Sequence, residues 1–359
     1  MNSESPLNNV DFQSIHSAAT SSDLRLARWT EESKLVQAFS SVSIEEWNGI
    51  VNRLQDEVMS QAVKLCERNM AEAGMGVPPV PFAFVLFGSG GRYEQTPWSD
   101  QDNGIIFADG GGKEAEKYFE EFGLRLSVIL EETGYPPCQG KVMVSNGMWR
   151  QSLGSWHQQL VKWREDSRWE DVRYLTIASD MRCVAGDSSL AAEWRRDFMD
   201  IMRRDEELEA ALLGNTVRHK AALNILGQVI TERFGEHAGE FDVKYGLYIP
   251  LVNGVRCLAL YYGISETSTL ERISKLHELE AFPRPWMDAL RRAFQKALKF
   301  RSMTTYHTEE GVLQSDSYLS QETLRQKEVF RELRESLVTV RQLYRMLQRQ
   351  HRFAERRRP

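Results

Sequence analysis

Two acidic side chains follow a cluster of glycines at a spacing that suggests joint chemistry. Residues 88–91 read GSGG, and ten residues separate Ser89 from Asp100, with Asp102 two positions further on. Side chains alternate between the two faces of a strand, so we expect both carboxylates to point the same way. Adjacent carboxylates repel each other, and a divalent cation with oxygen ligands, such as Mg²⁺ or Mn²⁺, relieves that repulsion.

The same stretch offers groups that bind phosphate. Gly88 and Gly90 lack a Cβ, so the backbone can approach a phosphate closely. Ser89 adds a hydroxyl, and Arg92 carries a planar guanidinium suited to phosphate oxygens. Alone, the glycine cluster is typical of a turn, and the aspartate pair of a solvated strand end. Together they predict that residues 88–102 bind a metal–nucleoside triphosphate.

Apolar runs flank this polar stretch on both sides. Residues 82–87 (FAFVLF) and 104–107 (GIIF) are predicted to be strands. A helix is expected upstream, because Ser43 and Glu46 match a capping box and apolar residues follow from Trp47 at helical spacing. The glycine turn and the aspartates are therefore expected between two strands, which follow a long helix in the sequence.

Further elements are expected downstream. Residues 113–133 predict an amphipathic helix, and residues 141–145 (KVMVS) a third strand. Trp149, Trp156 and Trp163 share one apolar helical stripe. A stripe at this spacing is typical of a buried helix face, so we interpret these tryptophans as core and not as a base-stacking platform.

The string GSGGRYEQTPWSDQDN resembles the signature of the nucleotidyltransferase superfamily that includes DNA polymerase β. It is closer still to the nucleotidyltransferases related to the uridylyltransferase domain of the enzyme that modifies the PII signal protein. The segments GYPPCQGKVMVSNGMWRQSL and SDMRCVAGD resemble the same family. No Gly-Lys-Ser/Thr follows the glycines, so the stretch is not a P-loop.

This resemblance implies transfer of a nucleoside monophosphate, UMP in the PII enzyme, from a triphosphate such as UTP or ATP to an acceptor hydroxyl. It implies that Asp100 and Asp102 hold the metal and that a third carboxylate, for which Asp180 is our candidate, is a metal ligand or general base. A salt bridge from Asp180 to Arg182 or Arg173 is the alternative. The triphosphate-binding residues expected here are Gly88, Ser89, Gly90 and Arg92.

The composition becomes helical from about residue 188, with one helix predicted over residues 216–234. The run FDVKYGLYIPLVNGVRCLALYYGISETSTLERISKL resembles the helical substrate-binding domain of the same family. Arg256 lies in a run too apolar for a free charge, so it requires an anion or an internal acid such as Glu271. The nucleotide-binding residues expected in this domain are Lys244, Arg256, Thr269 and Arg272.

We predict an α+β fold, with a small mixed-sheet polymerase-β-like catalytic domain followed by an α-helical bundle domain. The expected segments are a flexible or partner-ordered arm (1–22), N-terminal helices (23–75), the catalytic domain (76–187), the helical domain (188–352) and a basic tail (353–359).

The composition bears on three kinds of partner: nucleic acid, metal ions and the membrane. The 359 residues carry a net charge of −6, which gives no support for a general nucleic-acid binder. The four cysteines, at 66, 138, 183 and 257, form no metal-binding pattern, and we interpret them as reduced thiols of a cytoplasmic protein. No apolar run reaches the roughly 18 residues of a membrane span, and no signal peptide is recognised.

Two other functions fit the same residues. The chain could be a non-catalytic nucleotide sensor, although a sensor has no need of the paired Asp100 and Asp102. It could also modify a small molecule, as aminoglycoside nucleotidyltransferases do, which would require an acidic pocket for a cationic acceptor. The acceptor is a protein in the PII-like interpretation and a small molecule in this one.

Overall fold

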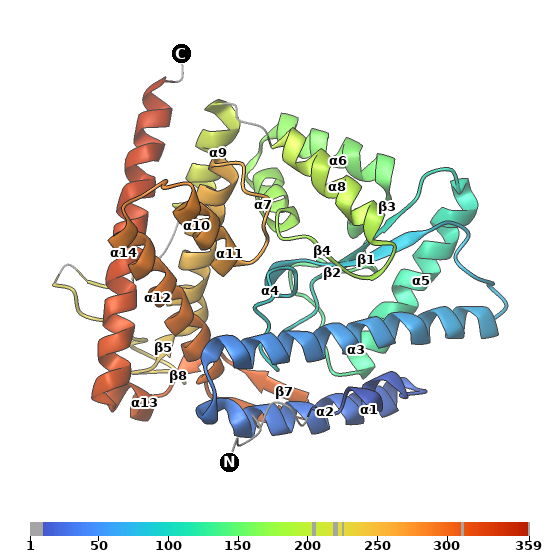
Figure 1. Cartoon of the computed structure of the whole chain (residues 1–359), viewed down its shortest axis with the longest axis horizontal. Coiled ribbons are helices and arrows are strands. Elements are labelled where there is room, and N and C mark those ends of the chain that lie inside the picture. The colour runs from blue at the N-terminus through green and yellow to red at the C-terminus, as the bar shows by residue number, and fades with distance from the viewer. Residues whose placement is uncertain (1–9, 203–205, 218–221, 225, 310–311, 358–359) are drawn as a thin grey trace. The chain divides into compact units, whose positions relative to one another are not determined.

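The computed structural model describes residues 10–202, 206–217, 222–224, 226–309 and 312–357 (Figure 1). The chain forms two compact units. Unit 1 comprises Met1–Val161, Asp180–Phe198 and Thr308–Gln314, and unit 2 comprises Lys162–Ser179, Met199–His307 and Ser315–Pro359. Unit 1 contains the sheet, whereas unit 2 is mainly helical, so the α+β class is confirmed.

A four-stranded mixed sheet forms the centre of unit 1, in the order β3-β2-β1-β4. The strands are β1 (Phe82–Leu86), β2 (Asn103–Phe107), β3 (Arg150–Ser152) and β4 (Arg182–Gly186). β1 runs antiparallel to β2 and β4, and β2 runs parallel to β3. Leu86 lies opposite Asn103, so the residues that follow β1 meet those that precede β2.

One face of the sheet packs against α3 (Ile44–Glu72) and α5 (Gly112–Glu132). α1 (Phe12–His16) and α2 (Ser21–Ala38) pack on α3 in turn (Figure 1). Alternate strand residues, including Phe82 and Phe84, join the core formed with them. The Ser43–Glu46 capping box that starts α3 is present, as predicted.

An aromatic cluster covers the other face. α6 (Leu153–Asp166) and α8 (Ser188–Ile201) lie on the opposite side of the sheet from α3 (Figure 1). The rings of Phe87 and Trp149 are 4.8 Å apart, and Trp156 lies 5.8 Å from Trp194. Trp156 also donates a hydrogen bond to Ile105 O in β2 (3.0 Å). These tryptophans are core residues, as the apolar stripe predicted.

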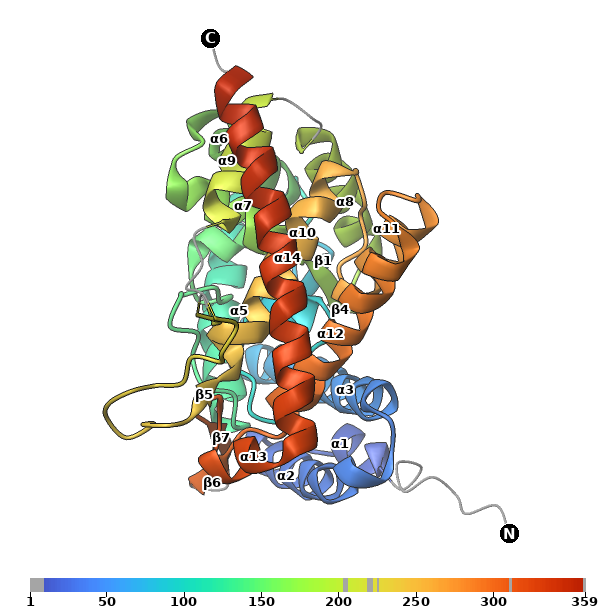
Figure 2. The same ribbon diagram turned by 90° about the vertical axis from the view of Figure 1, so that its left-hand side faces the viewer.

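Unit 2 is built around a long C-terminal helix. Its helices are α7 (Trp169–Ala178), α9 (Glu206–Thr216), α10 (Ile249–Tyr261), α11 (Thr269–Glu278), α12 (Arg284–Ser302), α13 (Gln321–Arg325) and α14 (Lys327–Arg357). α12 and α9 both pack along α14 (Figure 2). A π-helical turn, η4 (Lys244–Tyr248), leads into α10.

Short strands accompany these helices. β5 (Phe241–Asp242) pairs antiparallel with β8 (Tyr318–Leu319). β6 (Tyr306–Glu309) pairs with β7 (Val312–Ser315) in a two-stranded ribbon, of which Thr308–Gln314 is assigned to unit 1.

Two local predictions were wrong. Residues 141–145 are not a strand, because Asn103 holds them as a loop: its N–H donates to Val142 O (3.0 Å) and its Oδ1 accepts from Val144 N (2.8 Å). The helix predicted over 216–234 is not found in the described residues, because α9 ends at Thr216 and residues 217, 222–224 and 226–234 are not helical. Residues 218–221 and 225 lie outside the described part of the chain.

The two ends of the chain differ from simple polar tails. Residues 10–22 contain α1 and the beginning of α2, and Ile15 in α1 is fully buried, so this part of the expected arm is ordered. Residues 1–9 lie outside the described part. At the other end, α14 continues through Arg357, into the segment expected as a basic tail.

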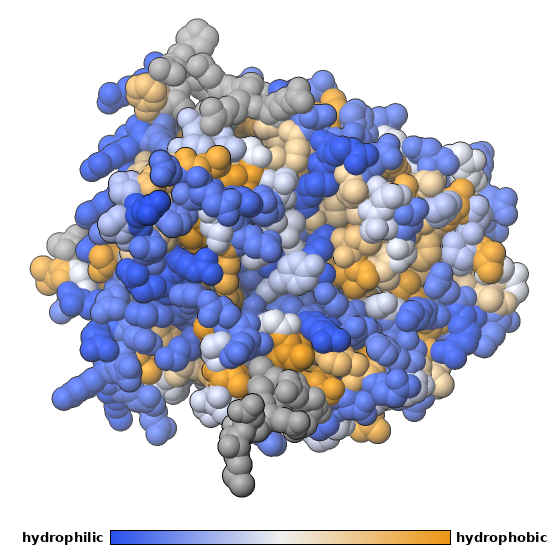
Figure 3. Space-filling model, viewed as in Figure 1, coloured by the Kyte–Doolittle hydropathy of each residue, from blue (hydrophilic) through white to orange (hydrophobic). Residues whose placement is uncertain are grey.

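The face drawn in Figure 3 is mostly hydrophilic, and its hydrophobic residues form separate patches among polar ones. None of the helices in the described ranges combines the length and the apolar character that a bilayer crossing requires. None of the four cysteines is part of a disulfide bond.

Gly91 allows a close approach between β4 and the turn after β1. A Cβ at Gly91 would overlap with the backbone carbonyl of Asp180, and backbone cannot move aside as a side chain can. We expect Gly91→Ala to lower the free energy of unfolding by about 1–3 kcal/mol. Gly49→Ala is the control, because Gly49 is exposed in α3 with no atom near the new methyl, so it should stabilise by roughly 0.5–1 kcal/mol.

Urea unfolding of both variants measures this difference. Equal stabilities for the two variants would contradict the close packing assigned to Gly91.

Candidate functional site

The glycine cluster and the two aspartates meet at one end of β1 and β2. The glycines form the short helix α4 (Gly88–Gly91) directly after β1. Phe87 N–H donates to Asp102 O (2.9 Å), which ties the start of this turn to the aspartate segment. Asp100 and Asp102 precede β2 instead of lying within it, and the residue between them, Gln101, pairs with a neighbouring loop.

Three potential metal ligands gather at this place. Asp100, Asp102 and Cys138 each offer one ligand atom, and these atoms lie within 4.8 Å of one another. All three residues are half-buried. The closeness of the two carboxylates agrees with the sequence prediction, whereas the thiol is an addition from the loop that follows α5.

The charges of the aspartates act on the thiol. Burial, reinforced by the neighbouring Asp102 carboxylate, raises the pKa of the Cys138 thiol to about 12. The thiol is a hydrogen-bond donor to Asp102, which stabilises its protonated form further. The protein therefore places a protonated thiol against one of the two candidate metal-binding carboxylates.

Gly88 is required by the position of Asp102. Its φ of +52° lies in the left-handed region that residues with a Cβ rarely adopt. A Cβ there would also overlap with Asp102 Oδ2. The carboxylate can thus approach the turn because residue 88 has no side chain. Ser89, next in the chain, is half-buried. Within the part of the chain that the structure describes, its hydroxyl has no hydrogen-bond partner.

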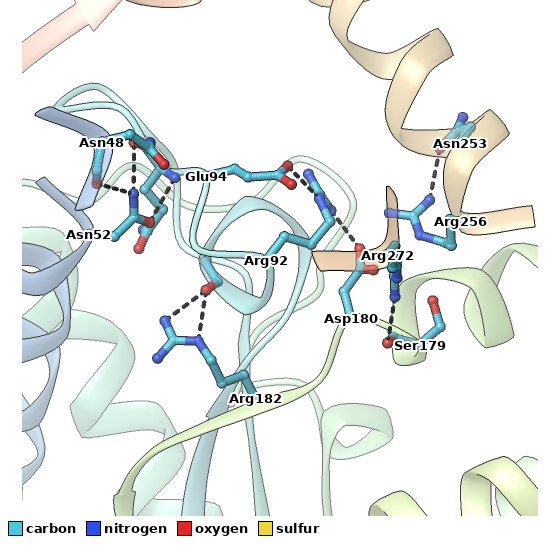
Figure 4. A network of polar contacts seen from close by, with 12 residues as sticks. Asn48, Asn52, Arg92, Glu94, Ser179, Asp180, Arg182, Asn253, Arg256 and Arg272 are labelled. Atoms are coloured by element: carbon cyan, nitrogen blue, oxygen red, sulfur yellow. Dashed lines mark hydrogen bonds and ion pairs between the residues drawn. The ribbon is translucent and has the colours of Figure 1, made fainter. Parts of the chain in front are cut away.

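Arg182 fixes the glycine turn from β4 (Figure 4). Its Nε and Nη2 donate to Gly90 O at 3.2 and 2.8 Å, and its Nη1 and Nη2 form a bidentate pair with Asp56 of α3 at 2.8 and 2.7 Å. The guanidinium also lies 3.6 Å from the centre of the Tyr93 ring. One arginine thus joins the helix, the edge strand and the turn.

Arg92 lies in a second buried network. Its Nε donates to Glu94 (2.7 Å) and its Nη1 to Asp180 (2.5 Å), and each of these three side chains is at most 4% exposed (Figure 4). Asp180 was our candidate for a third metal ligand, but it is not in the group formed by Asp100, Asp102 and Cys138. A salt bridge was the alternative, and its partner is Arg92, not Arg182 or Arg173.

The four remaining predicted residues belong to unit 2. Lys244 begins η4, and Thr269, fully buried, is the first residue of α11. Arg256 in α10 is 6% exposed, and one of its contacts is a hydrogen bond from its Nη1 to Asn253 Oδ1 (2.8 Å). Arg272 is 1% exposed and donates to two backbone carbonyls, those of Glu266 (2.7 Å) and Ser179 (3.1 Å) (Figure 4).

Comparison with known proteins agrees with this geometry. Residues 31–170 match the family described as "Putative nucleotidyltransferase DUF294", and residues 206–351 match "Putative nucleotidyltransferase substrate binding domain". The chain belongs to this nucleotidyltransferase family. The first match contains the glycine turn, both aspartates and Cys138, and the second contains Lys244, Arg256, Thr269 and Arg272. No curated protein matches the chain.

Sequence reasoning missed Cys138, Arg182 and Asp56 as parts of the site. Cys138 had one available signal, because it lies in a Gly/Pro-rich loop, GYPPCQG, where a buried structural cysteine is not expected. Arg182 and Asp56 are 126 residues apart, and no local pattern announces their pairing.

The role of Gly88 can be isolated with a matched control. Gly88→Ala and Gly112→Ala introduce the same methyl at nearly equal backbone angles, φ +52° and +53°, but no atom lies near the new methyl at Gly112. Both variants should lose about 1–2 kcal/mol of stability through backbone strain. Only Gly88→Ala should also displace the Asp102 carboxylate and weaken Mn²⁺ binding, as followed by the loss of the free-ion EPR signal.

If Gly88→Ala bound Mn²⁺ as tightly as Gly112→Ala, the contact between residue 88 and Asp102 would be irrelevant to the metal site.

Proposed function

We propose that this chain moves a nucleoside monophosphate from a nucleoside triphosphate to an acceptor hydroxyl and releases pyrophosphate. The observation that carries the proposal is the gathering of Asp100 and Asp102 against the glycine turn, in a chain of a nucleotidyltransferase family. A divalent ion such as Mg²⁺ or Mn²⁺ fits the two carboxylates, and when bound it would neutralise phosphate charge at the reacting centre.

In this proposal the chain's own residues bind and orient the triphosphate. Asp100 and Asp102 hold the metal, and Ser89 offers its unpaired hydroxyl to a phosphate oxygen. Gly88 and Gly90 let the backbone approach the phosphates without a side chain between them. The site carries two carboxylates, so a triphosphate approaches favourably only together with a cation.

The reaction is a substitution at the α-phosphorus. The acceptor hydroxyl oxygen forms the new P–O bond, the bond from the α-phosphorus to the bridging oxygen of the β-phosphate breaks, and pyrophosphate leaves. The proton of the hydroxyl passes to a base. Asp180 is a poor candidate for that base, because its carboxylate is fully buried against Arg92.

We therefore assign Arg92 and Asp180 a positioning role. Arg92 immediately follows α4, and its contact with Asp180 ties that turn to the residues before β4. Breaking a buried ion pair by removing one partner is strongly destabilising, so this link keeps the turn in one position. In this proposal Arg92 and Asp180 position the turn, whereas the sequence analysis expected Arg92 to contact the triphosphate and Asp180 to contact the metal.

The helical unit is proposed to bind the substrate. Lys244, Arg256, Thr269 and Arg272 lie within the segment that matches a substrate binding domain, which supports contacts from this unit to nucleotide or acceptor. UTP as donor and a protein as acceptor, in the manner of the PII-modifying enzyme, form the specific version of the proposal. A small-molecule acceptor is the second version.

Transfer of label from [α-³²P]NTP tests the proposal. Each of the four nucleotides is incubated with Mg²⁺ or Mn²⁺, the protein and a cell lysate as acceptor pool, beside the variants Asp102→Asn and Asp187→Asn. Asp187 is a half-buried carboxylate that accepts hydrogen bonds from Ser189 at the start of α8, so its loss is a matched control outside the site. We expect labelled product and pyrophosphate with wild type and Asp187→Asn, and a loss of at least about 10³-fold with Asp102→Asn.

The size of the labelled product separates the versions, because a protein acceptor gives a band on a gel and a small molecule does not. Tight binding of metal–NTP without product from any nucleotide would favour a nucleotide sensor. Equal transfer by Asp102→Asn and wild type would contradict the proposed site.

A further inference from the structure

Cys138 shares a small volume with the two aspartates that the proposed function assigns to the metal. One ligand atom of each residue lies within 4.8 Å of the other two. Three atoms bound tetrahedrally to one ion at about 2.0–2.3 Å lie about 3.3–3.8 Å from one another. Each pair of these ligand atoms therefore has to close by at most about 1.5 Å for the thiol sulfur and both carboxylates to share an ion.

Gln101 fixes the loop that carries Cys138 next to the segment that carries Asp100 and Asp102. Gln101, between the aspartates, is 1% exposed and binds the loop that carries Cys138. Its N–H donates to Pro136 O (3.2 Å) and its Nε2 donates to Tyr135 O (3.2 Å). The loop is closed on its other side by a contact from Cys138 N to Met143 Sδ (3.3 Å). The position of the thiol relative to the aspartates is thus fixed by the backbone and by a buried amide.

Two other cysteines direct their thiols to backbone carbonyls and not to carboxylates. Cys66 is buried in α3 and directs its thiol to Phe122 O, and Cys183 directs its thiol to Ala185 O, both at 3.5 Å. Only Cys138, among the cysteines of the described chain, is part of a group that could hold a metal. Core packing accounts for Cys66, whereas Cys138 is half-buried beside two carboxylates.

We propose that Cys138 is the third protein ligand of the metal at Asp100 and Asp102, and that the site prefers a softer ion such as Zn²⁺ or Co²⁺ to Mg²⁺. The metal's part in nucleotidyl transfer rests on the proposed function, but the ligation does not. Thiolate ligands favour Zn²⁺ and similar ions, whereas sites made only of oxygen ligands suit Mg²⁺ and Mn²⁺.

The donor set also leaves room for substrate. Three protein ligands with one open position are the arrangement of catalytic zinc sites, in contrast to the four closed ligands of structural sites. A phosphate oxygen fits the open position. Ion binding breaks the S–H bond of Cys138, forms a sulfur–metal bond and releases one proton to solvent, so no oxidant or reductant is required.

Co²⁺ reports thiolate ligation directly. The full-length protein is freed of metal and titrated with Co²⁺, and the near-ultraviolet sulfur-to-cobalt charge-transfer band is recorded. Wild type should develop this band with one equivalent of Co²⁺. Cys183→Ser is the control, because Cys183 is a half-buried thiol outside the group, and it should give the same band.

Cys138→Ser should abolish the band and weaken Zn²⁺ binding. Loss of a group that only orients a metal ligand weakens binding roughly 10–100-fold, and the loss of a direct ligand should exceed this. The affinity of this variant for Mg²⁺ should change far less. Cys138→Asp guards against a folding defect, because it restores a third ligand as oxygen: it should bind Mn²⁺ without any thiolate band. A band that persists in Cys138→Ser, or Co²⁺ binding to wild type without a band, would overturn the proposal.

The same preparations separate this inference from the proposed function. Transfer activity supported by Mg²⁺ and unaffected by Cys138→Ser, without a thiolate band, would reject the ligand and keep the enzyme. A thiolate band in a protein that transfers no nucleotide would keep the ligand and reject the enzyme.

Discussion

Two carboxylates that repel each other, those of Asp100 and Asp102, are held together at one end of β1 and β2. The antiparallel register of β1 and β2, with Leu86 opposite Asn103, brings the glycine turn and the aspartate segment to the same end of the sheet. Gly88 then lets Asp102 approach where any other residue would collide with it. Because repulsion between the carboxylates weakens the fold locally, the surrounding contacts must be strong, and a bound cation would add to them.

Buried arginines supply those contacts. Arg182 joins Asp56 of α3 to Gly90 O, and Arg92 joins Glu94 to Asp180, so the turn is held from two sides. Burial raises the pKa of Asp56, while Arg182 acts in the opposite direction. A buried ion pair adds less to stability than its Coulomb energy suggests, but it specifies one arrangement, which a site for an ion and a triphosphate requires.

The parts that could be predicted from sequence are those fixed by nearby residues. The strands around the polar stretch, the Ser43–Glu46 capping box and the burial of the tryptophans follow from local patterns, and the structure contains each of them. The single helical stripe is only partly present, because Trp149 lies in a 3₁₀ turn that β3 separates from α6. The pairing of Asp180 with Arg92 spans 88 residues and could not be derived from either neighbourhood.

The prediction of a strand at residues 141–145 was wrong for a similar reason, because a contact from a distant part of the sequence decides the structure there. The segment has a short apolar run, Val142–Val144, but Asn103 binds the backbone of Val142 with its own N–H and that of Val144 with its side-chain Oδ1. Tertiary hydrogen bonds outweighed local propensity there. Cys138, which the sequence interpretation overlooked, lies three residues before this segment in the same loop, beside the aspartates.

The most direct test of the central claim is a crystal structure with Mn²⁺ and a nucleoside triphosphate that carries a non-cleavable α,β-methylene bridge. The account predicts an anomalous manganese peak at about 2.0–2.2 Å from carboxylate oxygens of Asp100 and Asp102, with the triphosphate against Gly88 and Ser89. An ordered triphosphate with its manganese bound elsewhere in the chain would contradict it.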